Sequence, residues 1–159
     1  MVRPTTDFAK EGLFNILSNH FDFGKVKVLD VFAGTGNISF EFISRGANSV
    51  LALDNNPKST EFIRQTAEKF GYTNLLVIRS DYLSFLSSTI KKWDLIFADP
   101  PYDMESISEI PTLVLDRQLL NPGGILVIEH DKKINFSSHQ FFSDHRVYGK
   151  VNFTFFRYG

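Results

Sequence analysis

A short turn with two prolines carries the most distinctive chemistry of the 159-residue sequence: Asp99-Pro100-Pro101-Tyr102. It directly follows an apolar run over residues 95–98, which is typical of a buried strand. The prolines fix φ at two successive positions and remove two backbone donors, so the Asp99 carboxylate and the Pro100 carbonyl are presented as acceptors in a stiff frame. Two such acceptors can hold the N–H bonds of a planar amine, while the ring of Tyr102 stacks on the base that carries it. We therefore expect Asp99, Pro100 and Tyr102 to act on an exocyclic amine.

A glycine-rich turn, Ala33-Gly34-Thr35-Gly36, follows an earlier apolar run over residues 26–31. Glycines let backbone amides approach a nucleotide-like ligand, and such ligands bind at the carboxyl ends of parallel strands. Asp30 lies inside the run, where its carboxylate can brace the loop and meet a cationic amino group but would repel a phosphate. A dinucleotide-binding fingerprint would also have glycine or alanine at Ser39. The loop therefore favours a ligand with a positive amino group over a dinucleotide.

Two further acids end apolar runs. Asp54 follows the second run, where a carboxylate can accept hydrogen bonds from both ribose hydroxyls of NAD or of S-adenosylmethionine. Asp81 and Tyr82 follow the third run and can hold an adenine by its amino group and its face. Asp81 could equally be a simple helix cap at the start of the stretch over residues 82–90.

The elements that position these residues alternate in type. Five short apolar runs rich in Val, Ile, Leu and Phe predict buried strands over residues 26–31, 50–53, 75–78, 95–98 and 125–128. Amphipathic stretches at 37–45, 57–70 and 82–90 predict helices between them, and another over 6–21 precedes them, capped by Thr5 or Thr6. This alternation predicts parallel strands joined by right-handed crossovers, with helices on both faces of the sheet.

Two extended runs close the sequence, over residues 141–148 and 151–158, with Gly149-Lys150 between them. They predict a strand pair at the sheet edge with at least one antiparallel strand. The expected fold class is α/β: a doubly wound, mostly parallel seven-stranded sheet with helices on both faces and an antiparallel strand near one edge. We expect a single domain over residues 1–159, in which an N-terminal helical segment (1–23) precedes a Rossmann-like core (24–159).

Composition narrows the possible classes. Seventeen Lys+Arg against 18 Asp+Glu give a net charge of −1, so a nucleic-acid partner would have to be held by a local patch. The basic residues that could form one gather late in the chain: Lys132, Lys133, Arg146, Lys150 and Arg157. The sequence has no cysteine, and its four histidines show no paired spacing, so we expect no metal site. No apolar run approaches the ~20 residues of a membrane span, and no signal peptide is evident, which predicts a cytoplasmic protein without membrane contact.

The order of these motifs resembles the class I S-adenosylmethionine-dependent methyltransferases, among them the amino-methylating enzymes with a (D/N/S)PP(Y/F) signature. A narrower resemblance begins at Arg3-Pro4-Thr5-Thr6-Asp7 and continues through the segment Asp30-Val31-Phe32-Ala33-Gly34-Thr35-Gly36. The sequence resembles the RsmD family, bacterial methyltransferases acting on the 2-amino group of a guanine in small-subunit ribosomal RNA. The likeness covers almost the whole chain, and after about Asp131 it lies only in the pattern of strands. Family members usually carry a basic hairpin before the first motif, where this sequence has two residues.

The resemblance implies S-adenosyl-L-methionine as cofactor and assigns a role to most of the residues above. Asp30, Gly34 and Gly36 would hold its methionine end, Asp54 its ribose, and Asp81 and Tyr82 its adenine; Phe32 and Asn55 belong to the same site. The segment Thr5-Thr6-Asp7 would lie over the methionine carboxylate, with Arg3 available to that carboxylate or to a phosphate. Asp99, Pro100 and Tyr102 would hold the target guanine. The implied partner is ribosomal RNA within a small subunit or its assembly intermediate, and the protein would be a monomer.

Other functions are compatible with the same residues. The proline turn also serves enzymes that methylate an adenine amine in DNA or RNA, or a glutamine amide in a protein. A non-catalytic RNA-binding assembly module could keep this fold, although an intact Asp99 turn argues against it. A nicotinamide-dependent oxidoreductase is disfavoured by Asp30 and Ser39.

Overall fold

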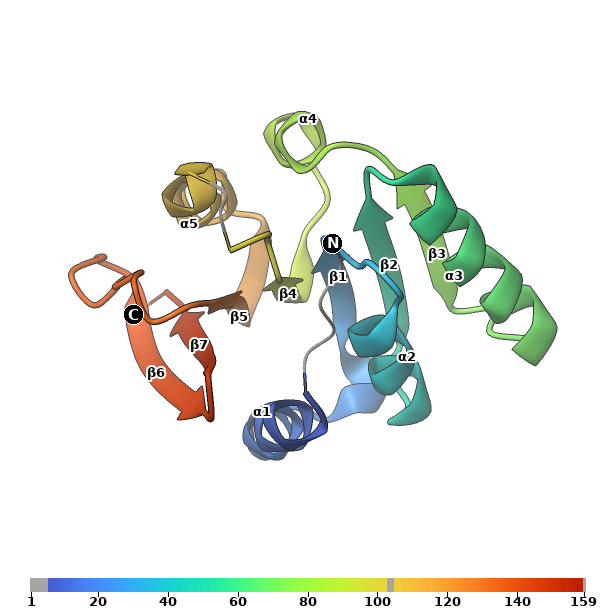
Figure 1. Cartoon of the computed structure of the whole chain (residues 1–159), viewed down its shortest axis with the longest axis horizontal. Helices are drawn as coiled ribbons and strands as arrows, with labels where there is room; N and C mark the ends of the chain where they lie inside the picture. The colour runs from blue at the N-terminus through green and yellow to red at the C-terminus, as the bar shows by residue number, and fades with distance from the viewer. Residues whose placement is uncertain (1–5, 103–104, 159) are drawn as a thin grey trace.

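In a computed structural model, which describes residues 6–102 and 105–158, seven strands form one sheet in the order β3-β2-β1-β4-β5-β7-β6 (Figure 1). The strands are β1 (Lys27–Val31), β2 (Ser49–Asp54), β3 (Leu75–Arg79), β4 (Trp93–Ala98), β5 (Leu120–His130), β6 (Phe142–Tyr148) and β7 (Val151–Phe156). The first five are parallel, and β7 is antiparallel to both β5 and β6. The predicted fold class, including its antiparallel strand near one edge, is confirmed.

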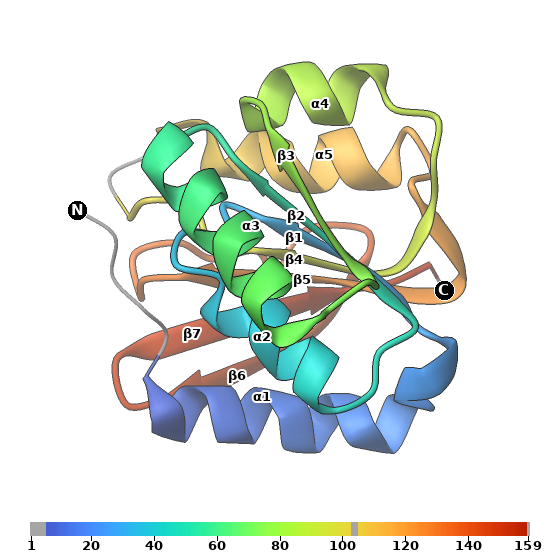
Figure 2. The same ribbon diagram turned by 90° about the vertical axis from the view of Figure 1, so that its right-hand side faces the viewer.

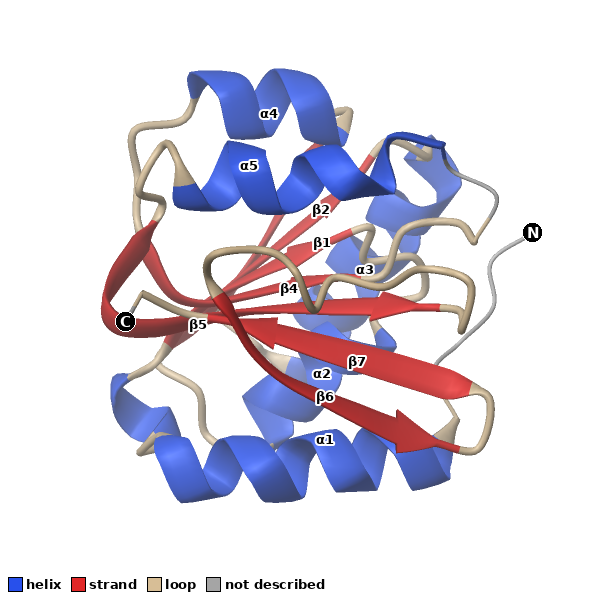
Figure 3. Cartoon of the chain, turned by 90° about the vertical axis from the view of Figure 1, so that its left-hand side faces the viewer, coloured by secondary structure: helices blue, strands red, loops and turns tan. Residues whose placement is uncertain are grey.

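Helices cover both faces of this sheet. One face carries α1 (Asp7–His20), α2 (Asn37–Ser44) and α3 (Pro57–Phe70), and the other carries α4 (Tyr82–Ser88) and α5 (Glu109–Leu115) (Figure 3). Successive strand residues point to opposite faces, so Val28 joins the apolar cluster beneath α1 and α2 while Leu29 joins the cluster beneath α4 and α5. None of the helices in the described ranges is long and apolar enough to cross a membrane.

Local sequence signals set the ends of α3, which packs along β2 and β3 (Figure 2). The Asn56 side chain accepts hydrogen bonds from the backbone amides of Lys58 and Ser59, and Pro57 occupies the first turn, where its missing N–H costs nothing. Gly71 ends the helix with φ of 70°, a left-handed conformation that favours glycine. These caps fix where the chain turns back into β3.

Several elements differ from the expectation. Strand β5 begins at Leu120 and extends to His130, although its apolar run covers only residues 125–128, because its first residues pair with β4 across a shift in register. Helix α4 ends at Ser88 rather than at residue 90. Helix α5 and the short 3-10 turns η1 (Phe23–Lys25) and η2 (Glu105–Ser108) were not predicted individually; Pro111 interrupts the helical pattern of α5.

The topology brings the predicted site residues to one edge of the sheet. From β1 the chain proceeds outward to β2 and β3, then crosses back to β4 on the other side of β1. Ligands of open α/β sheets bind at such a reversal, beyond the carboxyl ends of the strands. Val31 and Ala98 pair at the ends of β1 and β4, so the glycine loop and the proline turn leave the sheet side by side.

Candidate active site

The loop after β1 curls tightly into the start of α2. Phe32, Gly34 and Gly36 all have positive φ, of 63°, 59° and 83°. A non-glycine residue in this region is uncommon and concentrates at functional sites. A Cβ at Gly36 would also lie 2.8 Å from the ring of Phe40, so both the backbone conformation and the packing require glycine there. The loop therefore holds its backbone amides near the first turn of α2, where they can contact a ligand.

Asp54, at the end of β2, holds this loop in place. One carboxylate oxygen accepts a hydrogen bond from the Gly34 amide at 2.8 Å, and the other accepts one from the Asn56 amide at 2.8 Å. The bracing that the sequence suggested for Asp30 is therefore made by Asp54. The side chain lies half-buried beside the loop, and Asn55 next to it is exposed.

Asp30 is instead buried under the loop, with 1% of its surface exposed. Its carboxylate accepts a hydrogen bond of 2.6 Å from the Ser39 hydroxyl on α2. Burial raises the pKa of Asp30 to about 7, although the hydrogen bonds from Ser39 act in the opposite direction. A cationic group arriving nearby would favour the ionised form. Ser39, which the sequence presented only as a departure from a dinucleotide fingerprint, is thus the partner of the buried acid.

Two aromatic rings meet on the α4 side of the glycine loop. The centroids of Phe32 and Tyr82 lie 5.1 Å apart, and the Tyr82 hydroxyl forms a 2.7 Å hydrogen bond with the Ser106 hydroxyl of η2. Asp81, exposed beside them, caps α4 by accepting from the Ser84 amide at 3.0 Å, and this interaction lowers its pKa. The structure therefore gives Asp81 the role of a helix cap, and its contact with an adenine stays a prediction.

The proline turn lies directly beside the glycine loop. The Asp99 amide donates to the Val31 carbonyl at 3.3 Å, which fixes the start of the turn to the end of β1. Asp99 is half-buried, Pro100 is buried, and Tyr102 keeps 36% of its surface exposed. The proline turn therefore begins at the same edge of the sheet as the glycine loop.

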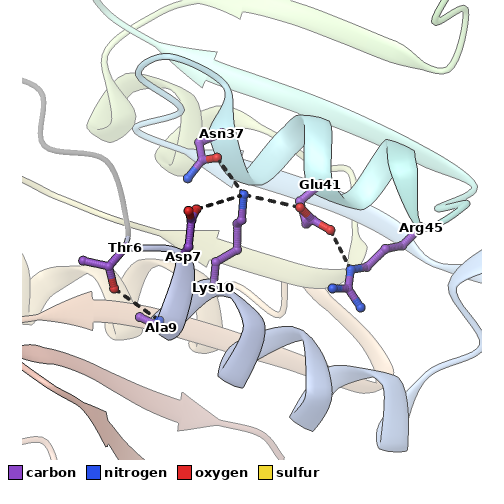
Figure 4. Close-up of polar contacts among 7 residues, drawn as sticks. All are labelled: Thr6, Asp7, Ala9, Lys10, Asn37, Glu41 and Arg45. Carbon is purple, nitrogen blue, oxygen red and sulfur yellow. Dashed lines mark hydrogen bonds and ion pairs between the residues drawn. The ribbon is translucent and has the colours of Figure 1, made fainter.

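Helix α1 is attached to α2 beneath this edge. The Thr6 hydroxyl caps α1 by accepting from the Ala9 amide at 3.2 Å, so its predicted contact with a cofactor stays a prediction. The Lys10 ammonium donates to Asn37 at 3.1 Å and pairs with Glu41 at 3.4 Å (Figure 4). The sequence did not single out Lys10. Arg3 and Thr5, which the resemblance also placed here, lie outside the described residues.

The end of β5 adds two buried polar side chains that the sequence analysis missed. Glu129 has 0% and His130 has 1% of its surface exposed. Because Ile128 pairs with Ala98, both residues continue β5 alongside the Asp99 turn. Their signal is a Glu-His pair after four apolar residues, but sequence alone does not show that the strand continues through them. Within residues 6–102 and 105–158, no group of three or more His, Cys, Asp or Glu is arranged to hold a metal ion.

Taken from β2 to β5, the edge has two parts. A glycine loop, two carboxylates and an aromatic pair form one part, which suits a ligand with a hydroxylated sugar, a flat ring and a cationic group. The acceptors and exposed ring of the proline turn form the other. The two parts meet where the ends of β1 and β4 pair.

Comparisons with known proteins agree with this geometry. A family described as "Conserved hypothetical protein 95" matches residues 1–157. "Ribosomal RNA small subunit methyltransferase D" of Buchnera aphidicola is 31% identical over 134 residues, covering 84% of this chain and 68% of that protein. The solved structure of yhhF from Escherichia coli superposes with a TM-score of 0.86 at 25% identity, covering 98% of this chain and 86% of the other.

A more distant neighbour shows the shared fold with a ligand. The structure of PKMT2 from Rickettsia typhi in complex with AdoHcy has a TM-score of 0.58 at 22% identity, covering 72% of this chain and 23% of that one. Its similarity to this chain concerns the fold alone. The family match and the named relatives confirm the enzyme class predicted from the motifs. The chain belongs to the RsmD family of S-adenosylmethionine-dependent methyltransferases.

Proposed function

We propose that the protein transfers a methyl group from S-adenosyl-L-methionine to the 2-amino group of a guanine in small-subunit ribosomal RNA. The observation that supports this proposal is the hydrogen bond from the Asp99 amide to the Val31 carbonyl, because it joins the start of the proline turn to the end of β1, just before the glycine loop. The name of the relative from Buchnera aphidicola supports ribosomal RNA as substrate.

The residues of the loop side fit this cofactor. Positive φ at Gly34 and Gly36 curls the loop so that its backbone lies at the start of α2, where a ligand can approach it. Asp54 can accept from the ribose hydroxyls while it braces Gly34, and the rings of Phe32 and Tyr82 border a place for the adenine. The buried Asp30 carboxyl lies under the loop, where its ionised form would stabilise a positive amino group bound nearby.

The methyl group of the cofactor is already electrophilic, so the chemistry needs no covalent enzyme intermediate. The work of the protein is positioning: Asp99 and the Pro100 carbonyl hold the two N–H bonds of the guanine amine so that its lone pair points at the methyl carbon. Tyr102 stacks on the base and keeps it flat against the turn. In this transfer the amine nitrogen would bond to the methyl carbon as its bond to sulfur breaks, and the amine would lose one proton. The half-buried Asp99 carboxylate would receive that proton or pass it to water.

Methyl transfer from tritium-labelled cofactor tests the proposal. Purified protein is incubated with naked ribosomal RNA, a partly assembled small subunit and the mature subunit, and the labelled product is digested to nucleosides. We expect N2-methylguanosine from at least one of these substrates. Labelled methyladenosine or methylglutamine would instead support another amine as target, and binding of RNA without any transfer would support a non-catalytic assembly module.

Three further properties stay predictions: a single domain over residues 1–159, a monomer, and a cytoplasmic location. Action within a small subunit or its assembly intermediate belongs to the same proposal, and the three substrates above separate these contexts.

A further inference from the structure

A cavity lies at the end of β5, on the face of β5, β7 and β6 that carries α5. It has a volume of about 240 Å³ and is lined by His130, Lys132, Asn135, Phe136, Phe142 and His145, among others. The segment between β5 and β6, residues 131–141, supplies more than half of this lining. None of these residues has a part in the methyl transfer described above.

Two histidines form its most ordered part. His130 donates from Nδ1 to the Asp131 carbonyl at 2.7 Å, so its Nε2 accepts from the Thr154 hydroxyl at 2.7 Å. Burial lowers the pKa of His130, which agrees with this neutral form. The ring of His145 stacks over that of His130, with centroids 5.8 Å apart and planes at 22°.

The ring of His145 forms one hydrogen bond, whereas that of His130 forms two. Its Nε2 donates to the Asn152 side-chain oxygen at 2.9 Å, so Nδ1 is the ring atom left to meet a ligand. The residue is exposed, whereas His130 beneath it is buried. His130 and its two partners therefore hold a platform on which the ring of His145 is the accessible surface.

The rest of the lining has complementary chemistry. The ring of Phe136 packs edge-on against His130 at 5.3 Å, and Phe142 adds another ring to the wall. The Asn135 side-chain oxygen accepts from the Ser137 amide at 2.8 Å, which leaves its NH2 group to donate to a ligand, and the exposed Lys132 supplies a positive charge. Flat rings for a base, an amide for its edge and a cation for a phosphate are what single-stranded nucleic acid requires of a protein surface.

Size and position limit the ligand. The volume is below the ~300–1,000 Å³ of pockets that enclose drug-sized ligands, so it suits one base rather than a dinucleotide. His130 continues β5 alongside the turn on β4, and neighbouring strands lie only about 4.8 Å apart. A chain of a few nucleotides can therefore reach from the turn to the cavity.

We propose that this cavity binds one nucleotide of the RNA substrate close to the target guanine, with its base against His145 and its phosphate at Lys132. The inference rests on the proposed function, to which it adds a second contact that selects the RNA segment. It makes His145 and Lys132 binding residues, without any part in the methyl transfer itself.

The ring-proton NMR signals of the four histidines test this binding without any need for activity. Guanosine 5′-monophosphate and a short oligoribonucleotide are titrated in turn, and each signal is assigned with a single His→Gln variant. We expect saturable shifts of the His130 and His145 signals, while His20, at the end of α1, stays unchanged as an internal control. Unchanged His130 and His145 signals, or equal shifts of all four histidines, would overturn the proposal.

Variants then separate this inference from the proposed function. His145→Ala and Lys132→Ala should each weaken oligoribonucleotide binding by about tenfold, as for loss of one stacking or phosphate contact, and the effect should fall on KM for RNA rather than on kcat. His145→Phe keeps a ring and should lose less. Lys91→Ala is the matched control, since Lys91 is also exposed but precedes the opposite end of β4.

The outcomes are distinct. Equal RNA affinity of Lys132→Ala, His145→Ala and the control would overturn the cavity as a nucleotide site even if the wild type methylates ribosomal RNA. If these two variants lose RNA binding and the wild type transfers no methyl group to RNA, the proposed function would be wrong while the nucleotide site would be supported.

Discussion

The two sides of the sheet edge hold their polar groups in different ways. On the β1 and β2 side, Asp54 accepts from a backbone amide of the loop and Asp30 from a hydroxyl on the adjoining helix. On the β4 and β5 side, His130 and His145 are held by side chains of the antiparallel β7, and Tyr102 and His145 are exposed. The first side is built before any ligand arrives, which suits one small cofactor of fixed shape. The second presents open rings, which suits a large partner.

The largest effect expected from this division is at Asp99. Asp99→Ala should reduce methyl transfer by about a thousandfold or more, because the lost acceptor matters most in the transition state. Cofactor affinity should change only a few-fold, as measured by calorimetry. Asp99→Asn keeps an acceptor oxygen and should retain part of the rate.

Asp94→Asn, on the same strand, is the matched control. Asp94 accepts from the Lys27 amide and the Asn121 side chain at the amino end of β4, far from the edge. Near-normal transfer by Asp99→Ala would show that the turn is only a strand stop.

Asp30 gives the next largest effect, on stability and its dependence on pH. Its pKa is about 7 in the folded protein and near 3.8 when unfolded, so the folded state binds more protons between these values. The free energy of unfolding therefore falls as pH rises through this window, and the full cost is present above about pH 7. Asp30→Asn removes the ionisation, so its stability relative to the wild type should rise by about 2–3 kcal/mol from pH 5 to pH 8.

Urea unfolding of both proteins at the two pH values measures this difference. Ser39→Ala serves as the companion variant, since it removes the hydroxyl that favours the ionised carboxylate and should steepen the pH dependence. Parallel pH profiles of the wild type and Asp30→Asn would show that Asp30 stays ionised in the folded protein.

At Asp54, cofactor affinity should fall by about 1–3 kcal/mol on replacement with alanine, the cost of unpaired ribose hydroxyls. The structure adds a loss of stability, because Gly34 and Asn56 lose their acceptor. Calorimetry at a temperature where the variant is fully folded isolates the binding effect. Asp81→Ala, after the next strand, should weaken cofactor binding less. An unchanged dissociation constant in Asp54→Ala would show that the ribose does not bind at the end of β2.

Substitutions of Tyr102 test the substrate side and should have a smaller effect. Tyr102→Ala should weaken RNA binding by about 1–2 kcal/mol, the lower part of the range for one stacked base, since the ring is only partly exposed. Tyr102→Phe should be mild because the ring face remains. Equal RNA affinity of the two variants in a filter-binding assay would mean that Tyr102 does not stack on the base.

The smallest effect is expected at Lys10, which joins α1 to α2 beneath the loop. Lys10→Met should cost at most about 1 kcal/mol, because ion pairs near the surface contribute little. A fall of Tm by a few degrees with unchanged cofactor affinity would agree with a structural role. A marked loss of cofactor affinity would instead place Lys10 in the cofactor site.

The two sides also differ in how far sequence could predict them. The glycine loop and the proline turn lie in short segments next to apolar runs, so local sequence is enough to identify their residues. The bond between Asp30 and Ser39 depends on which face of α2 meets β1, and a motif does not state that. The contact of His130 with Thr154 depends on the register between β5 and the antiparallel β7, which apolar patterns leave open. Helix α5 was missed for a local reason, because Pro111 interrupts its helical pattern.

The structure of the protein with S-adenosylhomocysteine tests the central claim most directly. We expect its ribose hydroxyls to contact Asp54, its adenine to lie by Phe32 and Tyr82, and its sulfur to face the Asp99 turn. A ligand bound away from Asp54, or one whose sulfur is turned from Asp99, would contradict the division of the edge into a cofactor side and a substrate side.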